Sequence, residues 1–163
     1  MGAANVAVDD PDGATQDNWA ALPFNLVYTD WLVRDIRQWT ELYYFETSLD
    51  ADATNIGQNI NRYGVRFSLQ KNYRVTQSWS PWFGAGVDLS NTRYSTRHTK
   101  DSDGYLLQAF DDRDETNVSV LLNVLSEWSL QKDWTIGTKL EQSIATGGDI
   151  SEFSAALTVL HRY

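Results

Sequence analysis

The chain has 163 residues, no cysteine and a net charge of −9 at pH 7. Its length suits one domain, the lack of cysteine excludes disulfides and thiolate metal sites, and the acidic balance disfavours nucleic acid as a partner. Mean hydropathy is −0.44, and no segment approaches the roughly 20 apolar residues that a membrane-spanning helix needs.

The N-terminal part of the chain alternates less regularly than the rest. Residues 4–8 predict a first strand, since the acidic, Pro- and Gly-containing run at 9–13 has strong turn chemistry. Leu22, Phe24, Leu26 and Tyr28 alternate as on one face of a strand. Residues 30–38 fit either a short amphipathic helix or two strands that turn near 34–37, and we favour the strands. Residues 41–48 are strand-like, but either face could be the apolar one.

Five later segments alternate with a period of two: residues 62–75, 81–89, 116–130, 134–145 and 153–163. They are longer than the usual ~5–6 residues of globular strands and match the ~9–11 residues that cross a bilayer. Short links near 76–80 and 131–133 alternate with long polar links at 50–59 and 99–114. We therefore predict an all-β, eight-stranded antiparallel up-and-down transmembrane β-barrel, with an N-terminal segment at 1–19 and the barrel at 20–163. The count of eight rests on even strand number more than on pattern.

Alternation by itself does not say which face meets lipid. If the apolar face is outside, the barrel interior holds a polar plug of Arg62, Arg66, Asp88, Glu127, Lys139, Glu141 and Arg162. Tryptophans near the expected strand ends predict an aromatic girdle at the lipid headgroups, made of Trp39, Trp79, Trp82, Trp128, Trp134 and Tyr163. Gly84 and Gly86 are expected to leave room for an inward Trp82 or to permit strand coiling.

The segment Pro81-Trp82-Phe83-Gly84-Ala85-Gly86-Val87-Asp88 resembles a recurrent strand of small bacterial outer-membrane barrels. These include the transmembrane domain of outer-membrane protein A and the families of outer-membrane proteins W and X. The chain also ends in Tyr163, in phase with Phe153, Leu157 and Val159, as the C-terminal strands of such barrels do. Over residues 20–163 the resemblance implies location in the bacterial outer membrane. It also implies lipid, lipopolysaccharide and the assembly machinery, which reads the C-terminal strand, as partners, and it implies no activity.

No residue pattern predicts catalysis or a cofactor. Lipid A deacylases of this shape use a His-x-Ser pair, but His98 is followed by Thr99 and Lys100, and His161 by Arg162 and Tyr163. The acidic residues Asp101, Asp103, Asp111 and Asp112 suggest a weak divalent-cation loop, with a solvated acidic loop as the alternative. The full calcium-loop pattern fails, because Tyr105 stands at its fifth position.

The leading functional hypothesis is a structural or interaction protein, with a side-chain-filled interior, that acts through external loops at 50–59 and 99–114. One alternative is a narrow, porin-like channel for small or apolar solutes. Another is a soluble, lipocalin-like ligand-binding barrel, which requires Phe67, Val87 and Leu122 to meet one another inside.

Overall fold

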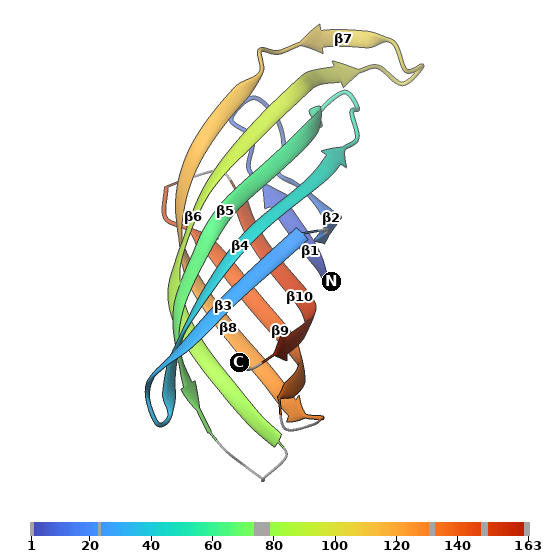
Figure 1. The fold of residues 1–163 in the computed structure, drawn as a ribbon. Helices are drawn as coiled ribbons and strands as arrows, with labels where there is room; N and C mark the ends of the chain where they lie inside the picture. The colour runs from blue at the N-terminus through green and yellow to red at the C-terminus, as the bar shows by residue number, and fades with distance from the viewer. Residues whose placement is uncertain (1, 23, 74–78, 131–132, 148–149, 162–163) are drawn as a thin grey trace.

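The computed structural model describes residues 2–22, 24–73, 79–130, 133–147 and 150–161. They form one antiparallel sheet with the strand order β2-β1-β10-β9-β8-β6-β5-β4-β3, to which β7 is added beside β6 (Figure 1). The strands are β1 (Gly2–Val8), β2 (Gln16–Leu22), β3 (Phe24–Val33), β4 (Ile36–Leu49), β5 (Gly57–Asn72), β6 (Trp79–Lys100), β7 (Leu106–Ala109), β8 (Arg113–Ser129), β9 (Trp134–Ala145) and β10 (Ile150–His161). Within these ranges no helix is long and apolar enough to cross a membrane.

The sheet curls around a central axis, and its long strands are strongly tilted (Figure 1). Its two terminal strands, β2 and β3, are consecutive in the sequence and separated only by residue 23. The Nδ2 of Asn18 on β2 donates to the carbonyl oxygen of Ser48 on β4 at 2.6 Å, which holds the two sides of the seam together. Among the described residues, no ladder pairs β2 with β3 to close the sheet at this seam. We name the end that carries the β3–β4, β5–β6 and β8–β9 links the turn end, and the opposite end the loop end.

The structure corrects the predicted number of strands from eight to ten. One additional strand is β7, a four-residue strand that is exposed on both faces and lies within the expected loop at 99–114. The other arises because the chain around residue 23 forms two strands with different partners: β2 pairs with β1, and β3 pairs with β4. The predicted strands at 4–8 and on both sides of 34–37 are confirmed, since β1 contains the first and β3 turns into β4 at residues 34–35.

A change of phase at residue 23 explains why periodicity missed this boundary. Leu22 on β2 is buried, whereas Leu26 and Tyr28 on β3 are exposed on the outer face. The prediction that these three side chains share one face is therefore wrong. The side chains that point inward are even-numbered on β2 and odd-numbered on β3. One extra residue at a β-bulge produces a shift of this kind. The side chain of Phe24 lies outside the described part of the structure.

The apolar face of the wall points outward. Phe67, Val87 and Leu122 are 39%, 43% and 48% exposed and lie on the outer surface of β5, β6 and β8. Their inward neighbours Arg66, Asp88 and Asn123 are almost completely buried. This is the opposite of the arrangement that a soluble lipocalin-like barrel requires, so that alternative is not supported.

The two glycines of β6 leave room for atoms of neighbouring strands rather than for the side chain of Trp82. A Cβ on Gly86 would lie 1.9 Å from the carbonyl oxygen of Phe67, and one on Gly84 would lie 2.4 Å from Oδ1 of Asn123. Trp82 is not among the atoms nearest to either position. The glycines therefore let the backbone of β5 and the side chain of Asn123 approach β6 closely.

Candidate functional site

The inward side chains form three successive layers between the two ends of the barrel. The turn-end layer consists of Arg37, Trp39, Trp82, Leu125 and Glu127, with Val27 and Leu160 packed against it. Arg37 donates to both carboxylate oxygens of Glu127, at 2.6 and 3.2 Å, and its guanidinium carbon lies 3.8 Å from the ring centroid of Trp82. Its Nε donates to Gln70 at 2.8 Å, and Trp39 lies beside it as well, so the buried cation is held by a carboxylate, an amide oxygen and aromatic rings.

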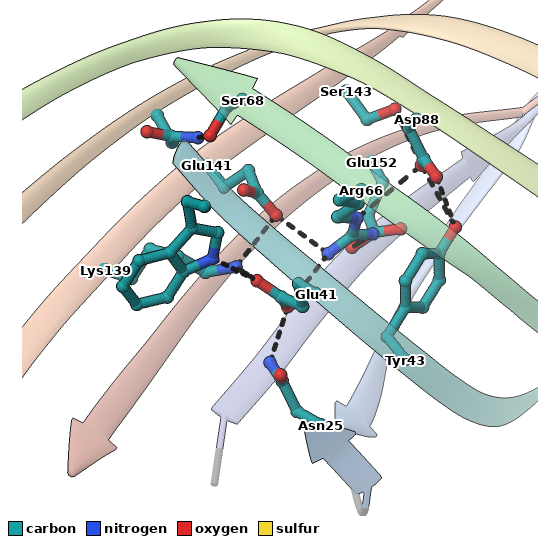
Figure 2. A network of polar contacts seen from close by, with 12 residues as sticks. Asn25, Glu41, Tyr43, Arg66, Ser68, Asp88, Lys139, Glu141, Ser143 and Glu152 are labelled. Atoms are coloured by element: carbon teal, nitrogen blue, oxygen red, sulfur yellow. Dashed lines mark hydrogen bonds and ion pairs between the residues drawn. The ribbon is translucent and has the colours of Figure 1, made fainter. Parts of the chain in front are cut away.

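The middle layer is an ionic network centred on Arg66 (Figure 2). Arg66 donates from Nη1 to Glu141 at 2.8 Å and from Nη2 to Glu152 at 2.6 Å, and its Nε lies 3.6 Å from a carboxylate oxygen of Asp88. Lys139 joins Glu141, at 3.1 Å, to Glu41. We call this set, which also contains Arg62, the ionic layer. Five strands supply its members: β4, β5, β6, β9 and β10.

The charges of the turn-end layer and the ionic layer nearly balance. Among the buried side chains described there, four cations (Arg37, Arg62, Arg66 and Lys139) face five carboxylates (Glu41, Asp88, Glu127, Glu141 and Glu152). A buried charge is costly unless it is paired and hydrogen-bonded. Each cation has a carboxylate partner within 3.1 Å, so the layers hold their charges by mutual pairing.

The loop-end layer is apolar, which the sequence did not predict. It contains Ala4, Val6, Val8, Ala20, Leu22, Tyr43, Phe45, Leu49, Ile60, Tyr94 and Ile150. Above it, Nη2 of Arg97 donates to Asp10 and to Asp12, at 2.8 Å in each case, so that the β1–β2 link is tied to β6 across the mouth. The sequence pattern did not decide which face of β4 points inward. In this layer the inward side chains of β4 are the aromatic Tyr43 and Phe45.

The structure places six members of the predicted polar plug inside the barrel and brings five of them into one network. Arg62, Arg66, Asp88, Lys139 and Glu141 belong to the ionic layer, and Glu127 belongs to the turn-end layer. Arg162 lies outside the described residues. Three further buried charges were not predicted from the sequence: Arg37, Glu41 and Glu152. Arg37 precedes the segment 41–48, whose two faces the pattern did not distinguish, and Glu41 begins it. Glu152 was detectable, because it lies two residues before Ser154 on the polar face of β10.

The predicted aromatic girdle is wrong for Trp39 and Trp82. Their side chains are 0% and 2% exposed and point inward, where they pack beside Arg37. Proximity to a strand end says nothing about which face a side chain occupies, so a girdle residue and an interior residue look alike in sequence. Trp79, Trp128 and Trp134 do lie exposed at the turn end, and Trp79 pairs with Trp128 across β6 and β8. Tyr163 lies outside the described residues.

The predicted cation loop is not assembled. In the part of the chain that the structure describes, no three acidic or histidine side chains are close enough to hold a metal ion. Asp101 accepts hydrogen bonds from the backbone of Asp103 and Tyr105, and Asp112 accepts from the backbone of Thr96. Asp111 instead contributes its carbonyl oxygen, which accepts from Arg97. These carboxylates stabilise turns rather than converge.

The β4–β5 link uses an acidic side chain in the same way. The backbone N–H groups of Thr54 and Asn55 donate to the carboxylate of Asp52 and hold its pKa below the usual value. At the rim nearby, Nδ1 of His98 lies 2.6 Å from the carbonyl oxygen of Thr96, its own strand neighbour. Neither residue is arranged for nucleophilic catalysis, which needs a base directed at a nucleophile.

Substitution of the central cation tests the ionic layer. We expect Arg66→Met to lower the free energy of unfolding by about 3–5 kcal/mol, because several buried carboxylates lose their partner. The matched control is Arg93→Met on the exposed pair with Asp114, which should cost no more than about 1 kcal/mol. Urea titration of the refolded proteins measures both. Equal losses for the two variants would show that Arg66 is not a central partner.

No protein-family model and no curated protein sequence matches the chain. Solved structures do: Ail, the attachment invasion locus protein of Yersinia pestis, has a TM-score of 0.58 at 13% identity, covering 99% of this chain and 94% of that one. Ail in complex with the heparin analogue sucrose octasulfate has a TM-score of 0.59 at 15% identity, with the same coverage. Neisserial surface protein A has a TM-score of 0.58 at 12% identity, also over 99% and 94%. Both neighbours are small bacterial outer-membrane β-barrels, and this chain shares their fold.

Proposed function

We propose that the chain is a bacterial outer-membrane β-barrel with a side-chain-filled interior, and that it acts as an interaction protein through its loop end. The observation that carries the proposal is the direction of the wall side chains, with apolar residues outside and paired charges inside. An apolar outer face is favourable in the hydrocarbon core of a membrane. A closed barrel can cross that core because the backbone groups of its strands pair with one another.

The ten strands fit a wall of eight if β2 and β3 act as one strand and β7, which lies off the main path of the sheet, is not counted. The combined strand pairs with β1 over its first half and with β4 over its second half, and β1 pairs with β10. Every neighbour is then antiparallel and consecutive, as in an up-and-down barrel. Residues 2–19 would belong to this wall rather than form a separate segment before it.

The two ends of the barrel suggest its orientation. The turn end has short links and carries the exposed Trp79, Trp128 and Trp134, which suit the periplasmic headgroup region. The loop end has the longer links and would face outward, toward lipopolysaccharide. The C-terminal strand β10 ends at the turn end, the place from which the assembly machinery would read it.

The three interior layers favour a barrel that does not conduct. Arg66 and its carboxylates cross the middle of the interior, with bulky apolar side chains above and aromatic side chains below. A barrel of eight strands has an interior just wide enough for side chains. Support for the channel alternative would need a continuous path past Arg66.

The β6–β7 hairpin is the most prominent element at the loop end and extends beyond the other strands (Figure 1). Its Tyr105, Leu106 and Leu107 are 72%, 63% and 57% exposed, and Asp101 and Asp103 lie beside them. Exposed apolar residues of this kind mark contact surfaces. The acidic surroundings favour a partner with a basic surface, in contrast to the heparin analogue bound to Ail, and the proposed role is non-enzymatic.

Spin labels test the membrane location. The chain has no cysteine, so Phe67→Cys and Ser68→Cys each introduce one labelling site. In bilayers we expect high oxygen accessibility for the label at 67, because it faces lipid, and low accessibility for the inward label at 68. Electron paramagnetic resonance measures both. A label at 67 that is shielded, or is reached mainly by a water-soluble relaxation agent, would contradict the proposal.

Planar bilayers test the filled interior. We expect no steady openings from the wild-type protein at neutral pH, because the ionic layer spans the interior. A heat-dependent gel shift of the same preparation serves as the control for folding. Steady openings from folded protein would support a narrow channel instead.

Immobilised poly-lysine and heparin test the charge of the partner. We expect retention on poly-lysine at low salt and none on heparin. Asp101→Asn with Asp103→Asn should weaken poly-lysine binding roughly three- to fivefold, at about 0.4 kcal/mol per charge. Asp30→Asn with Asp35→Asn, which removes the same charge near the turn end, should have a smaller effect. Equal effects, or retention on heparin, would contradict a role for the hairpin.

A further inference from the structure

The link between β1 and β2, residues 9–15, is tied to the loop end of the barrel by side chains. Nη2 of Arg97 on β6 donates to the carboxylates of Asp10 and Asp12, at 2.8 Å in each case. Nε2 of Gln58 on β5 also donates to Asp10, at 3.2 Å. Arg97 and Asp10 are both buried, so a buried ion pair holds this link, which we call the strap.

The backbone of the strap is held less firmly than its carboxylates. Among the described hydrogen bonds, its backbone reaches another segment at Ala14, whose N–H donates to the carbonyl oxygen of Thr54 at 3.3 Å. The N–H groups of Asp12 and Gly13 donate to Asp10, which belongs to the strap itself. A segment with few ties of this kind opens locally without unfolding of the whole barrel. Arg97 is therefore the main tie between the strap and β6.

A β-bulge at Thr96 directs Arg97 toward the strap. The inward side chains of β6 are even-numbered as far as Tyr94, whereas Arg97 is buried beyond it. Thr96 and Arg97 together lie opposite Gln58 of β5, and a bulge of this kind redirects a side chain. Thr96 has a φ of 55°, which a β-branched residue rarely adopts, and its N–H donates to the carboxylate of Asp112 at 3.1 Å. Backbone strain of this kind is found at functional positions.

Arg97 also contacts the base of the β6–β7 hairpin. Its Nη1 donates to the carbonyl oxygen of Asp111 at 2.9 Å, and its own carbonyl oxygen accepts from the N–H of Phe110 at 2.9 Å. Its guanidinium carbon lies 5.6 Å from the ring centroid of Phe110. Arg97 thus contacts both the strap and the segment that follows the exposed residues 105–107. A change at the hairpin can reach the strap through this one side chain.

Charge gives the direction of this coupling. The side chain of Asp12 is 47% exposed, whereas that of Arg97 is 4% exposed. A cationic group at the loop end can therefore reach Asp12 and compete with Arg97 for it. The same positive charge is unfavourable close to Arg97. A basic partner thus weakens the hold of Arg97 on the strap.

We propose that the β1–β2 link is a releasable strap held closed by Arg97, and that a basic partner docking on the β6–β7 hairpin opens it. A ligand shifts such an equilibrium only if it binds the open state more tightly. In the open state the partner gains the carboxylates that Arg97 releases and reaches the apolar loop-end layer beneath the strap. The role of the partner rests on the proposed function, whereas the hold of Arg97 on the strap does not.

Hydrogen exchange of the refolded full chain in detergent micelles, measured by mass spectrometry, tests the strap. We expect Arg97→Met to speed exchange of the amides of Gly13 and Ala14 about tenfold, because the strap loses its charged donor. Arg93→Met, which removes the same charge from the exposed face of β6, should leave them unchanged. The amides of β5 report that each variant is folded. If Arg97→Met does not refold, Asp12→Asn breaks one of the same bonds from the other side and should speed exchange about threefold.

Poly-lysine tests the coupling in the same preparation. At saturation we expect it to speed exchange of the strap amides at least about fivefold in the wild type and to add nothing in Arg97→Met. Asp101→Asn with Asp103→Asn should reduce this response, since both residues lie on the hairpin. Sodium chloride at equal ionic strength is the control for screening.

Equal strap exchange in Arg97→Met and Arg93→Met would overturn the proposal. Slower strap exchange with poly-lysine, or an equal response to sodium chloride, would overturn the coupling. Retention on immobilised poly-lysine with unchanged strap exchange would overturn the coupling and leave the proposed function standing. No retention on poly-lysine would overturn the basic partner in both proposals.

Discussion

Each wall strand separates two environments, and only one residue in two can face either of them. Inward positions are buried, so a charge placed there must meet an opposite charge. Arg66 meets Glu141 of β9 and Glu152 of β10, and Lys139 joins Glu141 to Glu41 of β4. A slip of one residue in any of these ladders would turn its charges toward the outer face. The ionic layer and the register of the sheet therefore depend on each other.

The same constraint makes the change of phase at residue 23 consequential. The chain reverses which parity faces inward between Leu22 and Leu26, and at this point β2 gives way to β3 as partners change from β1 to β4. On its other side β1 pairs with β10. The change of parity thus coincides with an exchange of ladder partners.

The wall and the loop end of the barrel differ in their chemistry. The fold is common to Ail and Neisserial surface protein A at 12–15% identity, which shows that the wall tolerates extensive replacement of its side chains. The loop end of this chain carries acidic residues and the exposed Tyr105 on the β6–β7 hairpin. A function carried by loops on a rigid wall is consistent with this division.

The sequence by itself determined the long strands, the two faces that its period of two separates, and most of the polar plug, because a charge within an alternating strand has only two directions to take. The tertiary structure decided the rest. It placed Trp39 and Trp82 inside, beside Arg37, since a position near a strand end does not reveal the face. It also paired Arg66 with Glu152, 86 positions away in the sequence. Such partners depend on the register of several ladders at once, which no local pattern in the sequence records.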